Sequence, residues 1–469
     1  MRLSTPGSFR QQVRFLQRQF LQDGGLPFTD VLSVELVSQA LAAANVVWNE
    51  RIYSPLVTLW VFLGQVLSQD HSCRAAVARL IAHRVSLGES ACSAETGAYC
   101  QARKRLPEKF FSAVARQVGR CLDEQSQPEW LWHGRRVYAY DGSTVTMPDT
   151  VENQAAYPQI PGQKPGLGFP IARLGAIFSL SCGALIDLGI CRYAGKGQSE
   201  ATLLRTMWSF FRTDDILLGD RLLCAWTELV VLKERGVDCV CRFTSHRKAD
   251  FRKGKRLGKG DHLVIWPKPT RRCIDRETHA KLPEFLLVRE CRVFIEQPGF
   301  RSRTLVLATT LLDANQHPKE ELVDLYRARW NAELDLRSLK CTLQMDILRC
   351  QTPELVRKEI WTHVLAYNLI RTIMAQAAAE HDLQPRTISF KGAVQTLEAF
   401  QPVIAMQGQS SSATRKGFYE RLLQCIASHR VADRPDRIEP RLRKRRFRRY
   451  EYLNKPRREA KLNILKGVR

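Results

Sequence analysis

One helical stretch, residues 326–340, constrains this chain more than any other part of its sequence. Within it, Tyr326, Arg329, Glu333 and Lys340 are spaced by three, four and seven residues. At ~100° per residue of an α-helix, all four side chains fall within an arc of roughly 60°. An apolar stripe lies beside that arc, formed by Leu322, Leu325, Ala332, Leu336 and Leu339. The helix is therefore predicted to run along the boundary between core and solvent, with one carboxylate, two cations and a phenol together.

Two β-prone runs elsewhere in the chain end in aspartate. The run 136–140 stops at Asp141, and the apolar run 216–219 stops at Asp220. A strand that ends in Asp places a carboxylate at the edge of a sheet, so the two carboxylates are expected side by side if their strands are neighbours. Asp214 and Asp215 precede the second run and would lie at its opposite end, which makes Asp220 the better candidate.

Asp141, Asp220 and Glu333 form a candidate metal site. Phosphoryl transfer through two magnesium ions requires several carboxylates around the metals, with open positions for the reacting oxygens. Each acid taken alone has an ordinary explanation, because aspartates often close turns and glutamates often lie on solvated helix faces. The hypothesis rests on the three acids being brought together by tertiary folding.

The charge of the chain indicates a polyanionic partner. The net charge is +25. Residues 434–469 hold 15 Lys and Arg against four Asp and Glu, a net of +11, which leaves +14 on the rest. Because both the tail and the body are basic, a long polyanion such as DNA fits better than a ligand for one basic segment.

The cysteines and the hydropathy exclude two other classes of protein. Fourteen cysteines are scattered through the chain, and no second Cys or His pair follows Cys239 and Cys241 at the spacing of zinc ligands. They are expected to be reduced thiols in a cytoplasm. The most apolar window, residues 56–67, is too short to cross a bilayer, so no membrane partner is expected.

The order of apolar and polar runs predicts an α/β protein in several parts. A helical region comes first, strands and helices alternate after it, and a β-prone region with a basic loop interrupts them. The predicted divisions are an α-helical domain over 1–125, a catalytic core over 130–235 and 316–400, a β-rich insertion over 236–315, and a C-terminal helical and basic segment over 401–469.

These motifs resemble those of the DDE transposases of the insertion-sequence-four family, which fold like ribonuclease H. The family signature is Tyr, two residues, Arg, three residues, Glu, six residues, Lys, and residues 326–340 match it without a gap. Asp141-Gly142-Ser143 resembles the first acidic motif, and Gly219-Asp220-Arg221 resembles the second. Leu222 and Leu223 depart from the second motif, where Gly or Ala and an aromatic residue are common. The likeness covers most of the chain.

The resemblance implies a ribonuclease-H-like core and cut-and-paste movement of a DNA element in a bacterial cytoplasm, at the nucleoid. It also implies that the N-terminal α-helical domain, residues 1–125, binds DNA and recognises the element's ends. The steps it implies are nicking at the element's end, a hairpin intermediate and strand transfer to target DNA. Asp141, Asp220 and Glu333 would bind Mg²⁺, with Mn²⁺ as a substitute. The partners would be double-stranded DNA, at the element's ends and the target, and a second copy of the chain in a paired-end complex.

Several residues are candidate DNA contacts. Arg329 and Lys340 would bind phosphates, and Tyr326 would contact the DNA backbone. The alternative is that Tyr326 is a half-buried supporting residue and that Lys340 is a solvated cation. Trp266 would stack on a base flipped from the duplex, although a tryptophan in a strand is more often part of a core. The basic loop supplies further phosphate contacts, unless it is only a charged turn: Arg252, Lys253, Lys255 and Arg256. The run 441–449 would add nonspecific attraction to DNA or dock on a second subunit.

Two other functions fit the same residues. One is a transposase-derived DNA-binding protein that recognises ends without cutting them, for which the altered residues after Asp220 leave room. The other is a structure-selective nuclease that hydrolyses DNA without strand transfer. A transposase cleaves DNA in the presence of metal, whereas the DNA-binding protein does not. A transposase also gives hairpin or joined products, whereas the nuclease does not.

Overall fold

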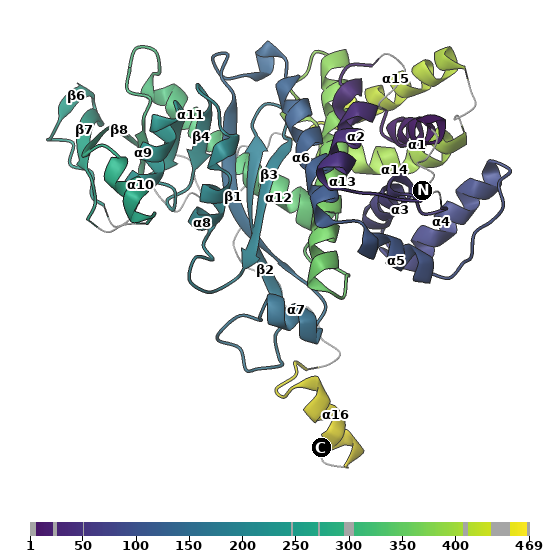
Figure 1. The fold of residues 1–469 in the computed structure, drawn as a ribbon. Coiled ribbons are helices and arrows are strands. Elements are labelled where there is room, and N and C mark those ends of the chain that lie inside the picture. The colour runs from purple at the N-terminus through teal and green to yellow at the C-terminus, as the bar shows by residue number, and fades with distance from the viewer. Residues whose placement is uncertain are drawn as a thin grey trace.

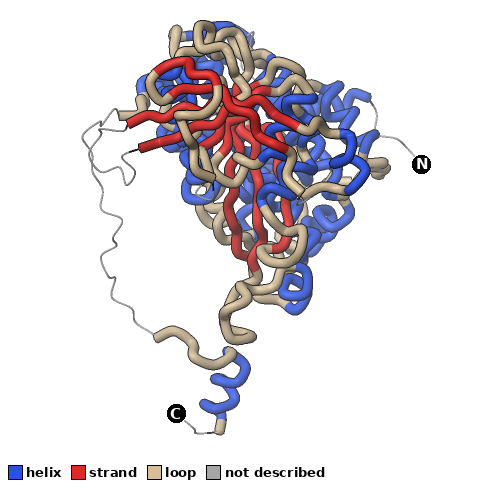
Figure 2. The backbone as a smooth tube through the Cα atoms, turned by 90° about the vertical axis from the view of Figure 1, so that its left-hand side faces the viewer, coloured by secondary structure: helices blue, strands red, loops and turns tan. Residues whose placement is uncertain are grey.

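The computed structural model describes residues 6–21, 26–49, 51–244, 247–270, 273–294, 304–406, 411–432 and 451–466. In these ranges nine strands form one mixed sheet, which runs from the middle of the molecule to its left-hand side in Figure 1, and most of the helices lie on the right. Figure 2 shows the same sheet from the side. The strands are β1 Val137–Thr146, β2 Ile171–Ser179, β3 Leu185–Arg192, β4 Ile216–Gly219, β5 Asp238–Arg242, β6 Lys255–Gly258, β7 Asp261–Pro267, β8 Phe285–Phe294 and β9 Thr304–Thr309.

The sheet has the strand order β3-β2-β1-β4-β5-β9-β8-β7-β6. β1, β2 and β3 form an antiparallel meander, and β4 and β5 run parallel to β1. β9 pairs antiparallel with β5 and leads to β8, β7 and β6. The β-rich region of the sequence is therefore an extension of the central sheet, and β5, which falls within 236–315, is one of its parallel strands.

Most of the helices lie before β1, in the region that the sequence predicts to be helical, and after β9. They are α1 Pro6–Gln19, α2 Val34–Ala43, α3 Pro55–Leu67, α4 Cys73–Ser86, α5 Gly97–Arg105, α6 Glu108–Glu124, α7 Val151–Ala156, α8 Glu200–Thr206, α9 Trp226–Glu234, α10 Arg276–Lys281, α11 Lys319–Ala328, α12 Trp330–Arg337, α13 Pro353–Glu380, α14 Phe390–Met406, α15 Ser412–Ser428 and α16 Arg457–Leu465. A π-helical turn, η4 (Ser338–Thr342), follows α12, and a 3₁₀ turn, η5 (Pro385–Thr387), follows α13.

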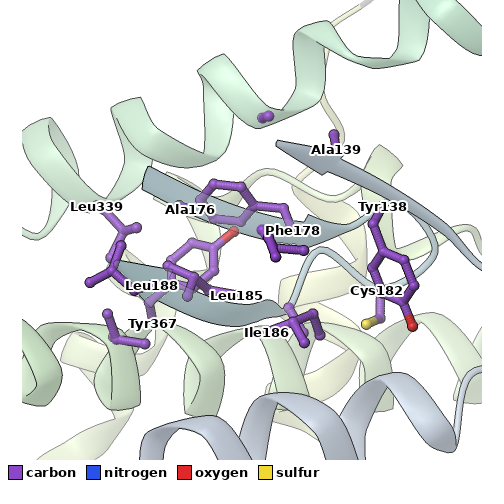
Figure 3. Close-up of a cluster of buried hydrophobic side chains, with 14 of the residues drawn as sticks. Tyr138, Ala139, Ala176, Phe178, Cys182, Leu185, Ile186, Leu188, Leu339 and Tyr367 are labelled. Carbon is purple, nitrogen blue, oxygen red and sulfur yellow. The ribbon is translucent and has the colours of Figure 1, made fainter. Parts of the chain in front are cut away.

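The 28-residue helix α13 joins the N-terminal helices to the sheet. It packs against α3 and α6 on one side and against β3 on another. Its residues from Ile360 to Ala378 are all buried, including polar ones such as Asn368 and Arg371, so every face of this part of the helix is covered by other elements. Tyr367 of α13 lies edge-on to Phe178 of β2, with 6.1 Å between the ring centroids, as Figure 3 shows within the buried cluster.

The alternation of side chains along β1 places helices on both faces of the sheet. The hydroxyl of Tyr140 donates to the carbonyl of Glu200 in α8 at 2.6 Å. Asp141, the next residue, points to the opposite face, because successive strand residues alternate, and there it approaches Arg329 between α11 and α12. The face that carries α12 is therefore the face on which the candidate acids converge.

A buried carboxylate fastens α12 to the helices behind it. Asp335 is 1% exposed and forms ion pairs with Arg371 of α13 and with Arg386 of η5, the latter at 2.6 Å. Arg371 also donates to the hydroxyl of Tyr367 at 2.8 Å. Since both guanidinium groups lie largely in the interior, Asp335 is their compensating charge. Glu333 is two residues away on the same helix, so this network fixes the helix that presents it.

The C-terminal helix α16 lies away from the sheet, below α7 in Figure 1. The basic run 441–449, predicted to bind DNA or a second subunit, falls outside the described residues. No helix in the described ranges combines the length and the apolar character needed to cross a bilayer.

Replacing Asp335 with Ala is expected to lower the free energy of unfolding by about 3–5 kcal/mol, because Arg371 and Arg386 would stay buried without a counter-charge. Asp324→Ala is the matched control, since Asp324 is 73% exposed and forms an ion pair with Arg327 at 2.9 Å; its cost should be about 0–1 kcal/mol. Urea unfolding followed by circular dichroism measures both. Equal costs for the two variants would contradict the anchoring role of Asp335.

Candidate active site

Asp141, within β1, and Asp220, directly after β4, stand level with each other across these two parallel strands. The last parallel pair joins Ala139 to Leu218, and each aspartate lies two residues further along. The sequence suggested that the first strand ends at Asp141, but β1 continues to Thr146. It does so because its pairing with β2 persists after its pairing with β4 has ended. Asp141 therefore lies within a strand, at the height where β4 stops.

The turn after β4 holds Asp220. Its Oδ1 accepts a hydrogen bond from the backbone N–H of Leu222 at 2.8 Å. Leu222 and Leu223 are the residues that depart from the motif resembled by the sequence. The contact uses the backbone of Leu222, so the turn does not require a particular side chain at that position. Leu223 is buried in the core.

The position after Asp141 leaves no room for a side chain, which explains why it is a glycine, Gly142. A Cβ atom at Gly142 would lie 2.3 Å from the Cδ of Glu200. The carboxylate of Glu200 is held there by Arg173, whose Nη1 donates to it at 2.8 Å. A side chain at position 142 would displace this ion pair and with it the strand that carries Asp141.

Glu333 approaches the strands from α12, and Arg329 lies between it and Asp141. The Nη2 of Arg329 donates to Oε1 of Glu333 at 2.7 Å, and its Nη1 is 3.8 Å from Oδ2 of Asp141. α11 ends just before Arg329 and α12 begins just after it, so this arginine occupies the junction of the two helices. One guanidinium thus bridges a carboxylate of the sheet and a carboxylate of the helix.

The site is a concentration of negative charge that is partly shielded from water. The pKa of Asp141 is raised to about 6, first by burial and to a smaller extent by the nearby charges of Glu333 and Asp220, while Arg329 and the N–H of Gly142 act in the opposite direction. Three carboxylates are the donor chemistry that Mg²⁺ and Mn²⁺ prefer, so the residues fit such an ion by type. In this arrangement, however, no three His, Cys, Asp or Glu side chains of the described residues are close enough to hold a metal ion.

Tyr326 and Lys340 border the same site. Tyr326 is 9% exposed, and burial raises the pKa of its phenol to about 12. Lys340 lies in the π-helical turn η4, where its Nζ donates to the hydroxyl of Ser143 in β1 at 3.1 Å. The predicted single helix is thus divided into α11, α12 and η4, and Lys340 contacts the strand that carries Asp141.

The candidates of the β-rich region lie elsewhere. Trp266 is 2% exposed, its indole N–H donates to Glu290 at 2.8 Å, and the guanidinium of Arg247 lies 3.9 Å from the centre of its ring. It is a core residue in this structure, as the alternative interpretation had it. The four cations of the basic loop are exposed on and before the edge strand β6, five strands away from β4: Arg252, Lys253, Lys255 and Arg256. The structure does not bring them to the carboxylates.

Arg242 is a site residue that the sequence analysis missed. β4 and β5 pair in parallel with Gly219 opposite Cys241, so Arg242 stands level with Asp220. Burial lowers the pKa of Arg242, and the neighbouring cations Arg221 and Arg329 lower it further. Only the parallel pairing of β5 with β4 shows that the last residue of β5 stands level with Asp220.

Asp215, the alternative to Asp220, lies at the opposite end of β4. It precedes β4, and its Oδ2 accepts from the backbone N–H of Arg212 at 2.8 Å. The choice of Asp220 therefore agrees with the direction of β4.

Comparison with known proteins gives consistent relatives. Residues 132–369 match the profile of the family described as transposase DDE domain. The chain is 29% identical over 374 residues to the transposase InsG for insertion sequence element IS4 of Escherichia coli K12, an alignment that covers 77% of this chain and 79% of that protein. It is 37% identical over 82 residues to the transposase for insertion sequence element IS421 of Escherichia coli, which covers 18% and 21% of the two chains. A solved piggyBac transposase synaptic complex with hairpin DNA aligns over 87% of this chain and 85% of its own, with 9% identity and a TM-score of 0.42.

The metal-free protein is expected to gain stability from Asp141→Asn above pH 6 but not near pH 4. Because the pKa of Asp141 rises from 3.8 to about 6 on folding, the folded protein keeps a proton that the unfolded chain releases in this window. Its stability therefore falls as the pH rises through the window. Asparagine does not ionise, so the variant should gain roughly 1–3 kcal/mol at neutral pH.

Urea unfolding in a metal chelator at about pH 4 and about pH 8 measures this difference. Asp324→Asn, on an exposed helix face, controls for the loss of one negative charge. A gain that is the same at both pH values would contradict the raised pKa of Asp141.

Proposed function

Because the chain belongs to the insertion-sequence-four family of DDE transposases, we propose that it moves a DNA element by metal-dependent phosphoryl transfer at Asp141, Asp220 and Glu333. The observation that carries this proposal is the geometry of the acids. Two aspartates stand level on neighbouring parallel strands, a glutamate approaches from a helix on the same face, and Arg329 contacts two of the three.

The proposed catalytic core is ribonuclease-H-like. Its support is the topology of the first five strands, an antiparallel meander β3-β2-β1 continued by β4 and β5 parallel to β1. In this arrangement the carboxyl ends of β4 and β5 lie side by side, and ligands of α/β proteins commonly bind at the carboxyl ends of parallel strands.

The three carboxylates would hold Mg²⁺ or Mn²⁺, which when bound would lower the pKa of a nucleophilic water and neutralise charge on the phosphate. The surrounding cations would bind the DNA backbone. Arg329 and Lys340 flank the acids from the helical side, and Arg242 does so from β5. Tyr326, which is largely buried beside Arg329, would support that arginine and form a hydrogen bond to the DNA backbone. Each group would hold a phosphate in line with the attacking oxygen.

The proposed reaction is cut-and-paste transposition. One strand is nicked at the element's end, the freed 3′-hydroxyl attacks the opposite strand to form a hairpin, the hairpin is reopened, and the 3′-hydroxyl attacks target DNA. All of these steps are displacements at phosphorus, so one set of side chains can serve them in turn. The pairing of two ends implies a homodimer. A bacterial cytoplasm, at the nucleoid, is the compartment in which such DNA is found.

The first test uses labelled duplexes made from the DNA that flanks the gene. With Mg²⁺ or Mn²⁺ the protein is expected to give nicked and hairpin products on denaturing gels, and Glu333→Gln is expected to give none, because it removes a charged ligand without changing the size of the side chain. Specific binding without cleavage in either metal would identify a DNA-binding relative without catalysis. Hydrolysis without hairpin or joined products would identify a nuclease.

A second test concerns Arg242. If it neutralises one phosphate, Arg242→Gln should weaken DNA binding and make the slope of log K against log salt less steep by about 0.9. Arg212→Gln is the matched control, because Arg212 is 71% exposed and lies beside Asp215 at the opposite edge of the sheet. Fluorescence anisotropy at several salt concentrations measures both slopes. An unchanged slope for Arg242→Gln would remove Arg242 from the DNA interface.

A further inference from the structure

We propose that Arg329 is an internal counter-ion for the metal-binding carboxylates, and that a DNA phosphate draws it away so that metal binding and DNA binding reinforce each other. This inference rests on the proposed metal-dependent transposase activity and adds to it a coupling between the two ligands.

The contacts of Arg329 are those of a bridging cation. Two of its nitrogens face two different carboxylates, Glu333 at 2.7 Å and Asp141 at 3.8 Å. The side chain of Arg329 is only 14% exposed, and the side chains of Asp141 and Glu333 are 20% and 35% exposed. Water screens these ion pairs less than it screens pairs on an open surface, so the attraction is substantial.

A metal ion would compete for the same carboxylates. Oε1 of Glu333 receives the hydrogen bond from Arg329, and an oxygen committed to a guanidinium is a weaker ligand for a cation. A divalent ion placed among the three acids would also repel the adjacent guanidinium. Metal binding therefore requires Arg329 to weaken its contact with Glu333, Asp141 or both.

A DNA phosphate offers Arg329 a replacement partner. A phosphate accepts two parallel hydrogen bonds from a guanidinium, as a carboxylate does. β5 places Arg242 level with Asp220, and the pKa of Arg242 is lowered by burial and by the nearby cations Arg221 and Arg329, so cations gather beside the carboxylates and would attract an anion. Movement of Arg329 from carboxylate to phosphate would release ligands for the metal and bind the DNA in one step. By linkage, metal binding would then favour DNA binding by the same factor.

A purely positioning role for Arg329 predicts the opposite effect. If the arginine only orients Glu333 toward the metal, its removal disorders a ligand and weakens metal binding. If it competes with the metal, its removal strengthens metal binding. The sign of the change in metal affinity therefore separates the two roles without any measurement of catalysis.

The experiment measures Mn²⁺ binding to the full chain by electron paramagnetic resonance, with and without a duplex made from the DNA that flanks the gene. Without DNA, Arg329→Gln is expected to bind Mn²⁺ about tenfold more tightly than the unsubstituted protein. Adding the duplex should tighten Mn²⁺ binding by the unsubstituted protein and change that of the variant much less.

Two further variants make the result specific. Arg327→Gln removes the same charge two residues away, from a side chain that is 55% exposed and pairs with Asp324, and it should leave Mn²⁺ affinity nearly unchanged. Asp141→Asn should reduce Mn²⁺ binding in every case, and circular dichroism establishes that each variant is folded.

Tighter binding by Arg329→Gln, together with a weaker response to DNA, supports the counter-ion role. Equal or weaker Mn²⁺ binding by Arg329→Gln overturns the counter-ion role. In that case the proposed metal site still stands if Asp141→Asn reduces Mn²⁺ binding. If Mn²⁺ binding is absent, or is indifferent to Asp141→Asn with and without DNA, then the metal site and the counter-ion role both fail.

Discussion

The parallel pairing of β1, β4 and β5 is the constraint on which the rest of the site depends. Because Ala139 pairs with Leu218 and Gly219 with Cys241, three positions fall in line across three strands: Asp141, Asp220 and Arg242. Register in a sheet has a period of two, so a slip of one residue would turn any one of these side chains to the opposite face. The backbone hydrogen bonds of the sheet thus decide that two carboxylates and a guanidinium share one edge.

The second constraint is the attachment of α12 to that edge. Glu333 is on a short helix of eight residues, and such a helix has little stability of its own. Asp335, buried between Arg371 and Arg386, ties it to α13 and η5. A buried ion pair of this kind contributes little net stability compared with apolar packing, but breaking it is costly. Its effect is to specify one position for the helix and therefore for Glu333.

Together these two constraints assemble like charges that would otherwise separate. The raised pKa of Asp141 shows the consequence, because burial and two neighbouring carboxylates disfavour its ionised form. Arg329 offsets part of this repulsion from the junction of α11 and α12. Sites built for chemistry commonly hold such unfavourable arrangements, which the rest of the fold must stabilise.

The sequence by itself determined the secondary structure and the chemistry of the residues, because both depend on local patterns. The predicted β-prone runs 136–140 and 216–219 correspond to β1 and β4, and the spacing from Tyr326 to Lys340 matches the family signature. Tertiary structure alone decided which strands are neighbours, since hydrogen bonds between β4 and β5 or between β1 and β2 join segments with no local signal for each other. For that reason the continuation of β1 past Asp141 and the place of Arg242 emerged only from the fold, as did the contact of Arg329 with both Asp141 and Glu333.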